Sequence, residues 1–237
     1  MKQFRNLLIA AALGQGLLPG ASAALAAPLD LEGVWRPIDP PKALLTTDGK
    51  APPLLPPARA VYERRKAQLA KGDLSFDRSS TRCGPEGEPR ILTEDAPFDI
   101  FQTPQKLLFG FERSRLLRYI DLDKPMDVIS PYYFGTSVGH ISGDRLEVEV
   151  QGFNDRFFLD RSGMPHSDAL SLKETFSLEP GGEVMRVRIR FEDPKTFSRP
   201  WETVLRFRKL KAVRIAEDVC PIRENLVPKD MQFFDPQ

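Results

Sequence analysis

From residue 90 onward the chain consists of short runs in which apolar and polar residues alternate. Between Arg145 and Val150 every second residue is apolar, and between Val184 and Phe191 arginines separate the apolar side chains. A period of two predicts strands with one buried and one solvent-exposed face. Short turn sequences such as Ser142-Gly143-Asp144 separate the runs, so we expect consecutive strands to pair as antiparallel hairpins.

This alternation predicts an all-β fold: an antiparallel barrel or barrel-like sandwich, with a lipocalin-like barrel among the options and one peripheral helix. The helix is expected at Ala58–Lys71, which follows two prolines, contains good helix formers and precedes Gly72. Gly33-Val34-Trp35 is similar to the G-x-W sequence that opens many lipocalin-like barrels. The expected strands are Leu31–Arg36, Arg90–Leu92, Phe98–Gln102, Lys106–Glu112, Leu116–Ile120, Thr136–Ile141, Arg145–Gln151, Leu170–Leu178, Glu183–Glu192 and Glu202–Leu210.

Residues 27–89 form a proline-rich segment that carries the helix, and residues 90–237 form the antiparallel β domain. Proline fixes φ and lacks a backbone N–H, so the stretch from residue 28 to 57 is expected to be extended and irregular. No break in the strand pattern defines a second core, so we expect both segments to pack together as one domain.

The N-terminus has the pattern of a secretory signal peptide. Lys2 and Arg5 precede an apolar stretch, and the small-residue sequence that ends at Ala26 predicts cleavage there, with Ala23 as the alternative. The apolar stretch is shorter than the roughly 20 residues of a membrane-spanning helix, so residues 1–26 are expected to be removed without membrane insertion. This predicts a periplasmic or secreted protein.

The charge balance and the cysteines add two further expectations. With 34 Lys and Arg residues against 33 Asp and Glu residues, the chain has no excess charge to attract nucleic acid or an anionic membrane. Cys83 and Cys220 are the two cysteines, and in an oxidising compartment they are expected to form a disulfide. Two buried free thiols are the alternative.

The long polar stretch from Gly152 to Leu170 is the strongest candidate site, because long loops in compact domains often carry function. His166 and Asp168 are two residues apart, so in an extended segment they would share a face. A carboxylate beside an imidazole orients the ring and raises its pKa, as a general base requires. Asp155 is a further candidate in this stretch, and turn formation is the structural alternative for these residues.

Two more candidates lie outside this stretch. His140 follows the expected strand residues Thr136–Gly139 and would face the same cavity if it points into a barrel. Glu112 closes an apolar run, and its alternative is a structural ion pair with Arg115 or Arg118. No P-loop, H-E-x-x-H or C-x-x-C sequence occurs, so we expect no cofactor.

One set of residues carries a family resemblance: Pro97, Phe98, Ile100, Gln102-Thr103-Pro104, Phe111-Glu112, Gly135–His140, Gly143-Asp144, Leu146, Gly152-Phe153-Asn154-Asp155, Leu159-Asp160, Gly163, Pro165–Leu170, Glu174, Asp193-Pro194, Arg199-Pro200-Trp201 and Cys220. In these residues much of the mature chain resembles a widespread family of secreted proteins from Gram-negative bacteria, which implies secretion and a similar architecture. The sequence differs at Ile141-Ser142, where the family usually has Trp and an acidic residue, so contacts from that strand do not carry over.

The leading functional hypothesis is an enzyme of the isomerase or lyase type that acts on a small, partly apolar molecule by cofactor-free acid/base chemistry. His166 would be the base or acid and Asp168 would orient it, while Asp155, His140 and Glu112 would be partners or substrate anchors. The alternatives are a non-catalytic periplasmic binding protein for an apolar ligand and a metal-dependent hydrolase that uses His166 and carboxylates.

Overall fold

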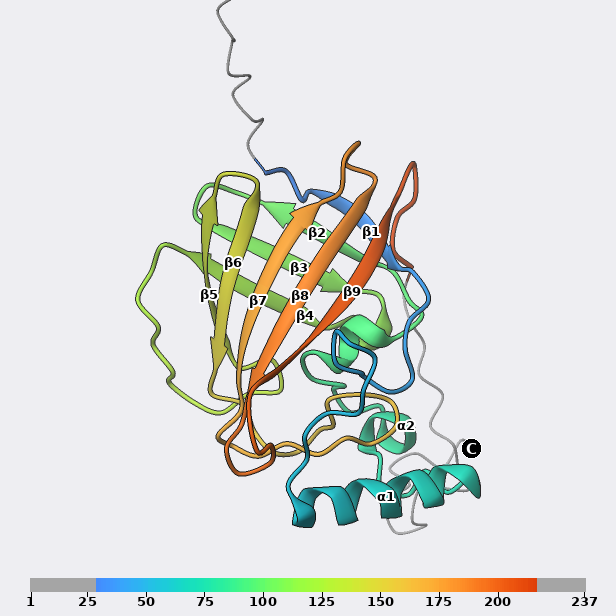
Figure 1. Ribbon diagram of the computed structural model, residues 1–237. Helices are drawn as coiled ribbons and strands as arrows, with labels where there is room; N and C mark the ends of the chain where they lie inside the picture. Colours follow the sequence, from blue (N-terminus) through green and yellow to red (C-terminus); the bar gives the residue numbers. More distant parts are fainter. Residues whose placement is uncertain (1–28, 217–237) are drawn as a thin grey trace, which may run out of the picture.

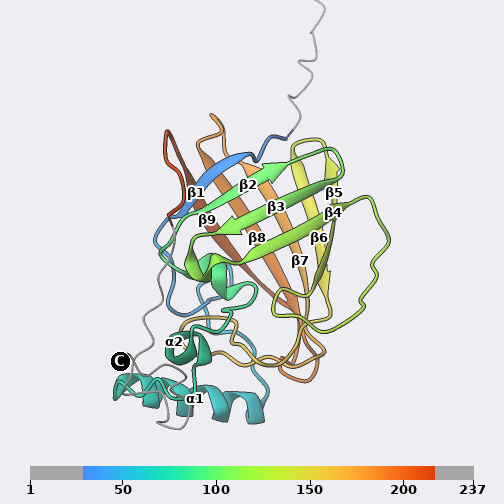
Figure 2. The ribbon, with the colours of Figure 1, turned by 180° about the vertical axis from the view of Figure 1, so that it is seen from behind.

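The computed structural model describes residues 29–216, in which nine strands close into a barrel (Figures 1 and 2). The predicted signal peptide and Cys220 lie outside the described residues, so the cleavage site and the disulfide with Cys83 stay predictions. The strands are β1 (Gly33–Pro37), β2 (Phe98–Gln102), β3 (Lys106–Phe111), β4 (Leu117–Leu122), β5 (Thr136–Ser142), β6 (Arg145–Gln151), β7 (Ser171–Leu178), β8 (Val184–Glu192) and β9 (Trp201–Leu210).

Each strand pairs with the next one along the chain, and β9 closes the barrel against β1. All pairs are antiparallel except β4 and β5, which are parallel because residues 123–135 cross from one end of the barrel to the other. The register within the long β7–β8 hairpin places Glu174 opposite Ile189. The alternating pattern of the sequence therefore becomes a barrel with a buried inner face and a polar outer face.

The predicted all-β barrel with one peripheral helix is confirmed. The helix α1 occupies Pro56–Ala70 and buries only Tyr62, which suits its place outside the barrel. One strand prediction is wrong: Arg90–Leu92 belongs to a buried 3₁₀ helix, η1 (Arg90–Thr93). The Ile91 N–H donates to the Gly87 carbonyl and the Leu92 N–H to the Pro89 carbonyl, so this apolar run satisfies its backbone locally and joins no sheet.

The segment that precedes β2 covers one end of the barrel, where α1 and α2 (Arg78–Arg82) lie beside the loop between β6 and β7 (Figure 1). The Leu44 N–H donates to Asp160 at 2.9 Å, and the Arg65 guanidinium donates to the Gly163 carbonyl at 3.0 Å. We call residues 77–97 the cap, because they pass over this end and lead into β2. No helix within residues 29–216 is long and apolar enough to cross a membrane.

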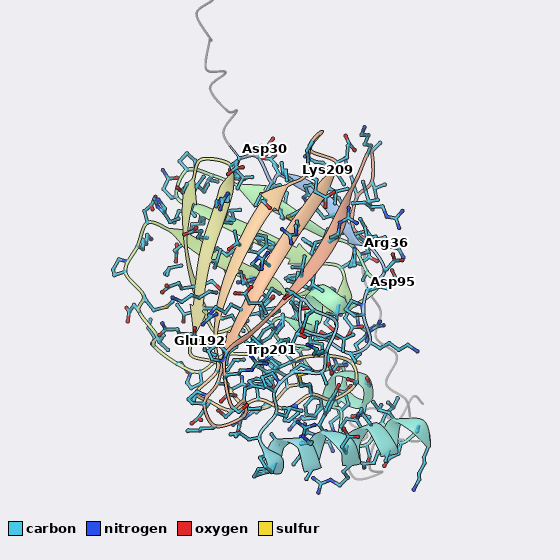
Figure 3. All side chains as sticks on the ribbon, in the orientation of Figure 1. Asp30, Arg36, Asp95, Glu192, Trp201 and Lys209 are labelled. Atoms are coloured by element: carbon cyan, nitrogen blue, oxygen red, sulfur yellow. The ribbon has the colours of Figure 1, made fainter. Side chains whose placement is uncertain are left out.

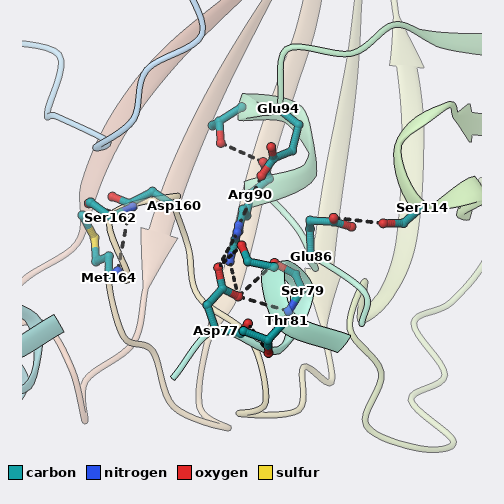
Figure 4. A network of polar contacts seen from close by, with 12 residues as sticks. Asp77, Ser79, Thr81, Glu86, Arg90, Glu94, Ser114, Asp160, Ser162 and Met164 are labelled. Atoms are coloured by element: carbon teal, nitrogen blue, oxygen red, sulfur yellow. Dashed lines mark hydrogen bonds and ion pairs between the residues drawn. The ribbon is translucent and has the colours of Figure 1, made fainter. Parts of the chain in front are cut away.

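Ion pairs within the cap give it a fixed shape (Figure 4). Asp77 accepts two hydrogen bonds from the Arg90 guanidinium, at 3.0 and 2.8 Å, and both side chains are buried. Glu94 accepts from Arg90 on its other side, at 3.3 Å. Glu86 accepts from Ser114 at 2.9 Å, which ties the cap to the turn η2 (Arg113–Arg115) between β3 and β4.

Aromatic side chains fill much of the barrel interior. Trp35 is buried and its indole N–H donates to the Leu31 carbonyl, and Phe98 packs against Phe109. Trp201 lies at the capped end (Figure 3). It stacks on Phe191 with ring centroids 4.0 Å apart. Both tryptophans thus belong to the hydrophobic core.

Candidate functional site

His166 lies in the loop between β6 and β7, where its side chain is packed among aromatic rings. It is 9% exposed, and its ring centroid lies 4.1 Å from that of Phe157 and 6.5 Å from that of Phe153. Burial lowers the pKa of His166 below its ordinary value, against the opposing effects of the Ser167 carbonyl and the Asp193 and Asp155 carboxylates. The imidazole is therefore neutral at pH 7.

The hydrogen bonds of His166 fix which nitrogen carries the proton. Its Nδ1 lies 3.0 Å from the Ser167 carbonyl oxygen, and because a carbonyl only accepts, Nδ1 must be the donor. In the neutral ring this leaves the lone pair on Nε2, which is buried and has no hydrogen-bond partner among the described residues. A neutral histidine with an unpaired Nε2 has the protonation state that a general base needs.

The expected hydrogen bond between Asp168 and His166 does not form. Asp168 lies in a turn with an exposed side chain that pairs with Lys195 at 2.7 Å, and this pair lowers its pKa. The prediction assumed an extended segment, and the turn removes the common face of residues two apart. Asp193 instead orders this loop, because it accepts from the Ser167 N–H and the Ser167 hydroxyl, each at 2.7 Å.

A pocket of about 430 Å³ lies next to His166 and contains two of the predicted site residues, Asp155 and Asp168. Phe153 lines this pocket and its ring centroid lies 6.5 Å from that of His166, which is not itself in the lining. The complete lining is Ser130, Pro131, Phe153, Asn154, Asp155, Arg156 and Asp168. An apolar ring beside charged and amide groups suits a small molecule of mixed polarity.

The structure places His140 and Glu112 elsewhere. His140 is exposed on the outer face of β5, because the inward position of this strand belongs to its neighbour Gly139. It pairs with Asp123 at 2.5 Å, and this contact raises its pKa. Glu112 accepts from the Ala216 N–H at 2.6 Å and lines a separate pocket of about 330 Å³ with Arg113. Its expected partner Arg118 instead points into the barrel. Neither His140 nor Glu112 therefore lies beside His166.

A second polar cluster lies inside the barrel, and its central residue is Arg118 on β4. The Arg118 Nη2 donates to Glu174 of β7 at 2.6 Å, and Nε and Nη2 approach the Ser137 hydroxyl of β5 at 3.3 and 3.2 Å. Glu88 reaches the same guanidinium from the cap, with its Oε2 at 3.5 Å from Nη1. Arg118 is 1% exposed and both glutamates are fully buried.

This cluster leaves several polar groups without partners. Among the described residues, no N–H or hydroxyl group donates to either oxygen of Glu88 or to Glu174 Oε1, and nothing accepts from Arg118 Nη1. Each unsatisfied buried group costs about 1–3 kcal/mol. Burial raises the pKa of Glu88 to about 8, with Glu174 adding to the rise and Arg118 opposing it. At pH 7 Glu88 is thus protonated and can share its proton with Glu174.

Part of this cluster has a signal in the sequence. Glu174 stands between Leu172 and Phe176 in the buried register of its strand, and Arg118 likewise precedes Ile120 and Leu122. A charged residue at an inward position is rare unless it is paired, so the alternation alone marks both residues. Glu88 has no such signal, because it follows an irregular stretch of the cap.

No group of three or more His, Cys, Asp or Glu side chains within residues 29–216 is arranged to hold a metal ion. The metal-dependent hydrolase hypothesis thus finds no support from the described residues. Comparison of the chain with protein-family models and with curated proteins finds no match. The resemblance drawn from the sequence motifs stays a prediction.

Proposed function

We propose that this protein is an enzyme that moves protons on a small, partly apolar molecule, with His166 as the base and without a cofactor. The observation that carries the proposal is the buried, unpaired Nε2 of His166, whose tautomer is set by the Ser167 carbonyl. A base of this kind takes a proton from carbon most readily when the site excludes water. The aromatic contacts of His166 provide that exclusion.

The pocket that contains Asp155 and Asp168 would hold the substrate, with Phe153 as its apolar wall. The proposal requires that Phe153, which is 1% exposed, moves so that Nε2 contacts the bound molecule. Nε2 then accepts a proton from a carbon next to a carbonyl, and the electron pair of the broken C–H bond moves toward that carbonyl. The protonated ring then donates a proton to another atom and completes an isomerisation, so atoms and charge balance. Exchange of the ring proton with solvent before this step introduces deuterium in D₂O.

Proton exchange in D₂O tests this proposal even while the product is unidentified. The mature protein is incubated with a panel of small carbonyl compounds, and ¹H NMR monitors the loss of carbon-bound protons. We expect catalysed exchange for at least one compound, and loss of that exchange in His166→Gln. His140→Gln is the matched control, because His140 lies on the outer face. Exchange that persists in His166→Gln contradicts the role of His166.

A non-catalytic binding protein is the second candidate, and the position of Asp168 favours it. Asp168 pairs with Lys195 and gives His166 no carboxylate to orient it, so part of the expected catalytic arrangement is missing. This candidate predicts that a compound of the panel binds with unchanged covalent structure and no deuterium exchange. Isothermal titration calorimetry on the same panel separates the two proposals.

We further propose export to the periplasm or beyond, with cleavage after Ala26 and a disulfide between Cys83 and Cys220. The support is the signal-peptide pattern and the even number of cysteines. Expression of the full chain in a Gram-negative host tests both proposals. Intact mass spectrometry should give a chain that begins at Ala27 and that gains the mass of two hydrogen atoms on reduction. An uncleaved chain contradicts the export proposal.

A further inference from the structure

The outer face of β8 and β9, which lie side by side in the barrel wall, carries arginines at facing positions (Figure 1). Arg186 on β8 is directly opposite Arg206 on β9. One row further along, Arg208 on β9 is opposite Arg36 on β1. Like charges at facing positions of an antiparallel pair lower the stability of the sheet. An anion bound between two such arginines would remove this cost.

Within residues 29–216, Arg186 has no carboxylate in ion-pair contact, unlike two of its neighbours. Arg206 donates two hydrogen bonds to Glu179, at 2.8 and 2.7 Å, and Arg188 donates to Glu202 at 2.7 Å. The hydrogen bond from Arg206 lowers the pKa of Glu179 and burial opposes it, whereas the charge of Arg186 adds only a smaller lowering. The Arg186 guanidinium therefore keeps its N–H donors for another partner.

A pocket of about 660 Å³ lies over this face and is lined by β8, β9 and the segment of residues 38–49. Two backbone hydrogen bonds hold that segment against β9. The Ile38 N–H donates to the Arg206 carbonyl at 2.8 Å, and the Thr47 N–H donates to the Glu202 carbonyl at 3.0 Å. The segment is thus anchored at both ends of the pocket, and the arginine side chains have a wall opposite them.

The lining of this pocket combines cationic and apolar side chains. Leu45 in the segment is 47% exposed, and Val204 stands beside the arginines on the outer face of β9. Asp39 is also in the lining, but three basic residues outnumber it. These basic residues are Arg186, Arg188 and Arg206. Such a lining suits an anion that carries an apolar body.

We propose that this pocket binds a small organic phosphate, with its phosphate group between Arg186 and Arg206 and its apolar body on Leu45 and Val204. A phosphate monoester carries about −1.5 to −2 charge units at pH 7, and its oxygens accept strong hydrogen bonds from guanidinium groups. It supplies the counter-charge that Arg186 lacks and offsets the repulsion between the facing arginines. The pocket shares no lining residue with the one next to His166, so this proposal is independent of the proposed proton-transfer chemistry.

Isothermal titration calorimetry of the mature protein at pH 7, with phenyl phosphate, inorganic phosphate and benzoate, tests the proposal. We expect phenyl phosphate to bind most tightly, because inorganic phosphate lacks the apolar body and benzoate carries a smaller charge. Arg186→Gln should weaken the binding of phenyl phosphate at least about tenfold. Arg190→Gln is the matched control and should weaken it much less, because Arg190 lies on the same face of β8 but outside the pocket.

Melting temperatures show whether Arg186 lacks a partner in the unliganded protein. Removal of one of two facing charges should leave the melting temperature of Arg186→Gln unchanged or raise it. A lower value would show that Arg186 has a structural partner and would contradict the proposal. Phenyl phosphate should raise the melting temperature of the wild type saturably and that of Arg186→Gln far less. The proposal is overturned if the wild type does not bind phenyl phosphate, if Arg186→Gln and Arg190→Gln weaken binding equally, or if benzoate or inorganic phosphate binds as tightly.

Soluble esters and membrane lipids both carry a phosphate on an apolar body, and a sedimentation experiment distinguishes these sources. The wild type, Arg186→Gln and Arg190→Gln are centrifuged with phosphatidylcholine vesicles that contain phosphatidic acid. We expect no sedimentation, because the 34 basic and 33 acidic residues of the chain give no general attraction to an anionic membrane. Sedimentation that Arg186→Gln abolishes and Arg190→Gln preserves would overturn the assignment to a soluble molecule and identify the phosphate as a lipid head group.

Discussion

Arg118 and Glu174 come from strands that are not neighbours in the barrel, and they meet in its interior with Nη2 and Oε2 2.6 Å apart. The contact crosses the space that apolar side chains otherwise fill. A buried ion pair of this kind adds little net stability, because desolvation offsets the attraction of the two charges. Loss of one partner strongly destabilises the fold, because the other charge is then buried without a counter-charge.

Arg118→Met should lower the free energy of unfolding by about 3–5 kcal/mol, because Glu174 and Glu88 then lose the cation that both contact. Urea unfolding followed by circular dichroism measures the effect. Arg145→Met is the control, because Arg145 forms an exposed pair with Asp144 on the barrel surface and should change the stability little. Equal effects of the two substitutions would contradict the importance of the buried cluster.

Glu88 should make the protein less stable as the pH rises. Its pKa is raised from 4.5 to about 8 in the folded protein, so its stabilising contribution is complete below pH 4.5 and is lost as the pH rises through about 8. The slope for one proton approaches about 1.4 kcal/mol per pH unit in this window. Glu88→Gln should remove this component, so the stability difference between variant and wild type grows toward high pH. If the free energy of unfolding has the same pH dependence in the wild type and in Glu88→Gln, as measured by urea unfolding, Glu88 is not the group responsible.

The pKa values of the two histidines should be shifted in opposite directions. Burial lowers the pKa of His166 below 6.5, whereas the contact with Asp123 raises the pKa of His140 above it. The raised value means that the stabilising contribution of His140 is present below pH 6.5 and is lost as the pH rises through the higher folded value. ¹H–¹³C NMR of the imidazole Hε1 protons measures both pKa values, and His140→Gln assigns the signals. We also expect ¹⁵N shifts of the Nδ1–H tautomer for His166.

Asp193→Asn should destabilise the loop around His166 by about 2–4 kcal/mol, because it weakens two charge-assisted hydrogen bonds to Ser167. Amide hydrogen exchange near Ser167 should accelerate in this variant. Asp168→Asn is the control, since Asp168 is exposed and only its surface pair with Lys195 is lost. Faster exchange in Asp168→Asn than in Asp193→Asn would restore the role that the sequence suggests for Asp168.

The strands were predictable because each has its own local signal. The alternation in Arg145–Gln151 and the glycine at position 143 specify a strand and a turn without reference to the rest of the chain. The prediction at Arg90–Leu92 was wrong for the same reason: the apolar side chains of this run are buried in the core, but they reach it from a 3₁₀ helix of the cap and not from a strand. The candidate site was harder to predict from the sequence. Asp168 and His166 are close in sequence, and a single turn separates their side chains.

The sequence by itself determined the class of fold, the peripheral helix and the residues that point inward, because periodicity and turn formation are local properties of the chain. Only the tertiary structure decided which charged groups meet. Glu88, Arg118 and Glu174 are widely separated along the chain, and they form one cluster because barrel closure and the cap bring them together. The same closure places His140 on the outer face, whereas His166 pairs locally with its neighbour Ser167 in the β6–β7 loop. Long-range contacts set the electrostatic environment of each group, and the local sequence does not encode that environment.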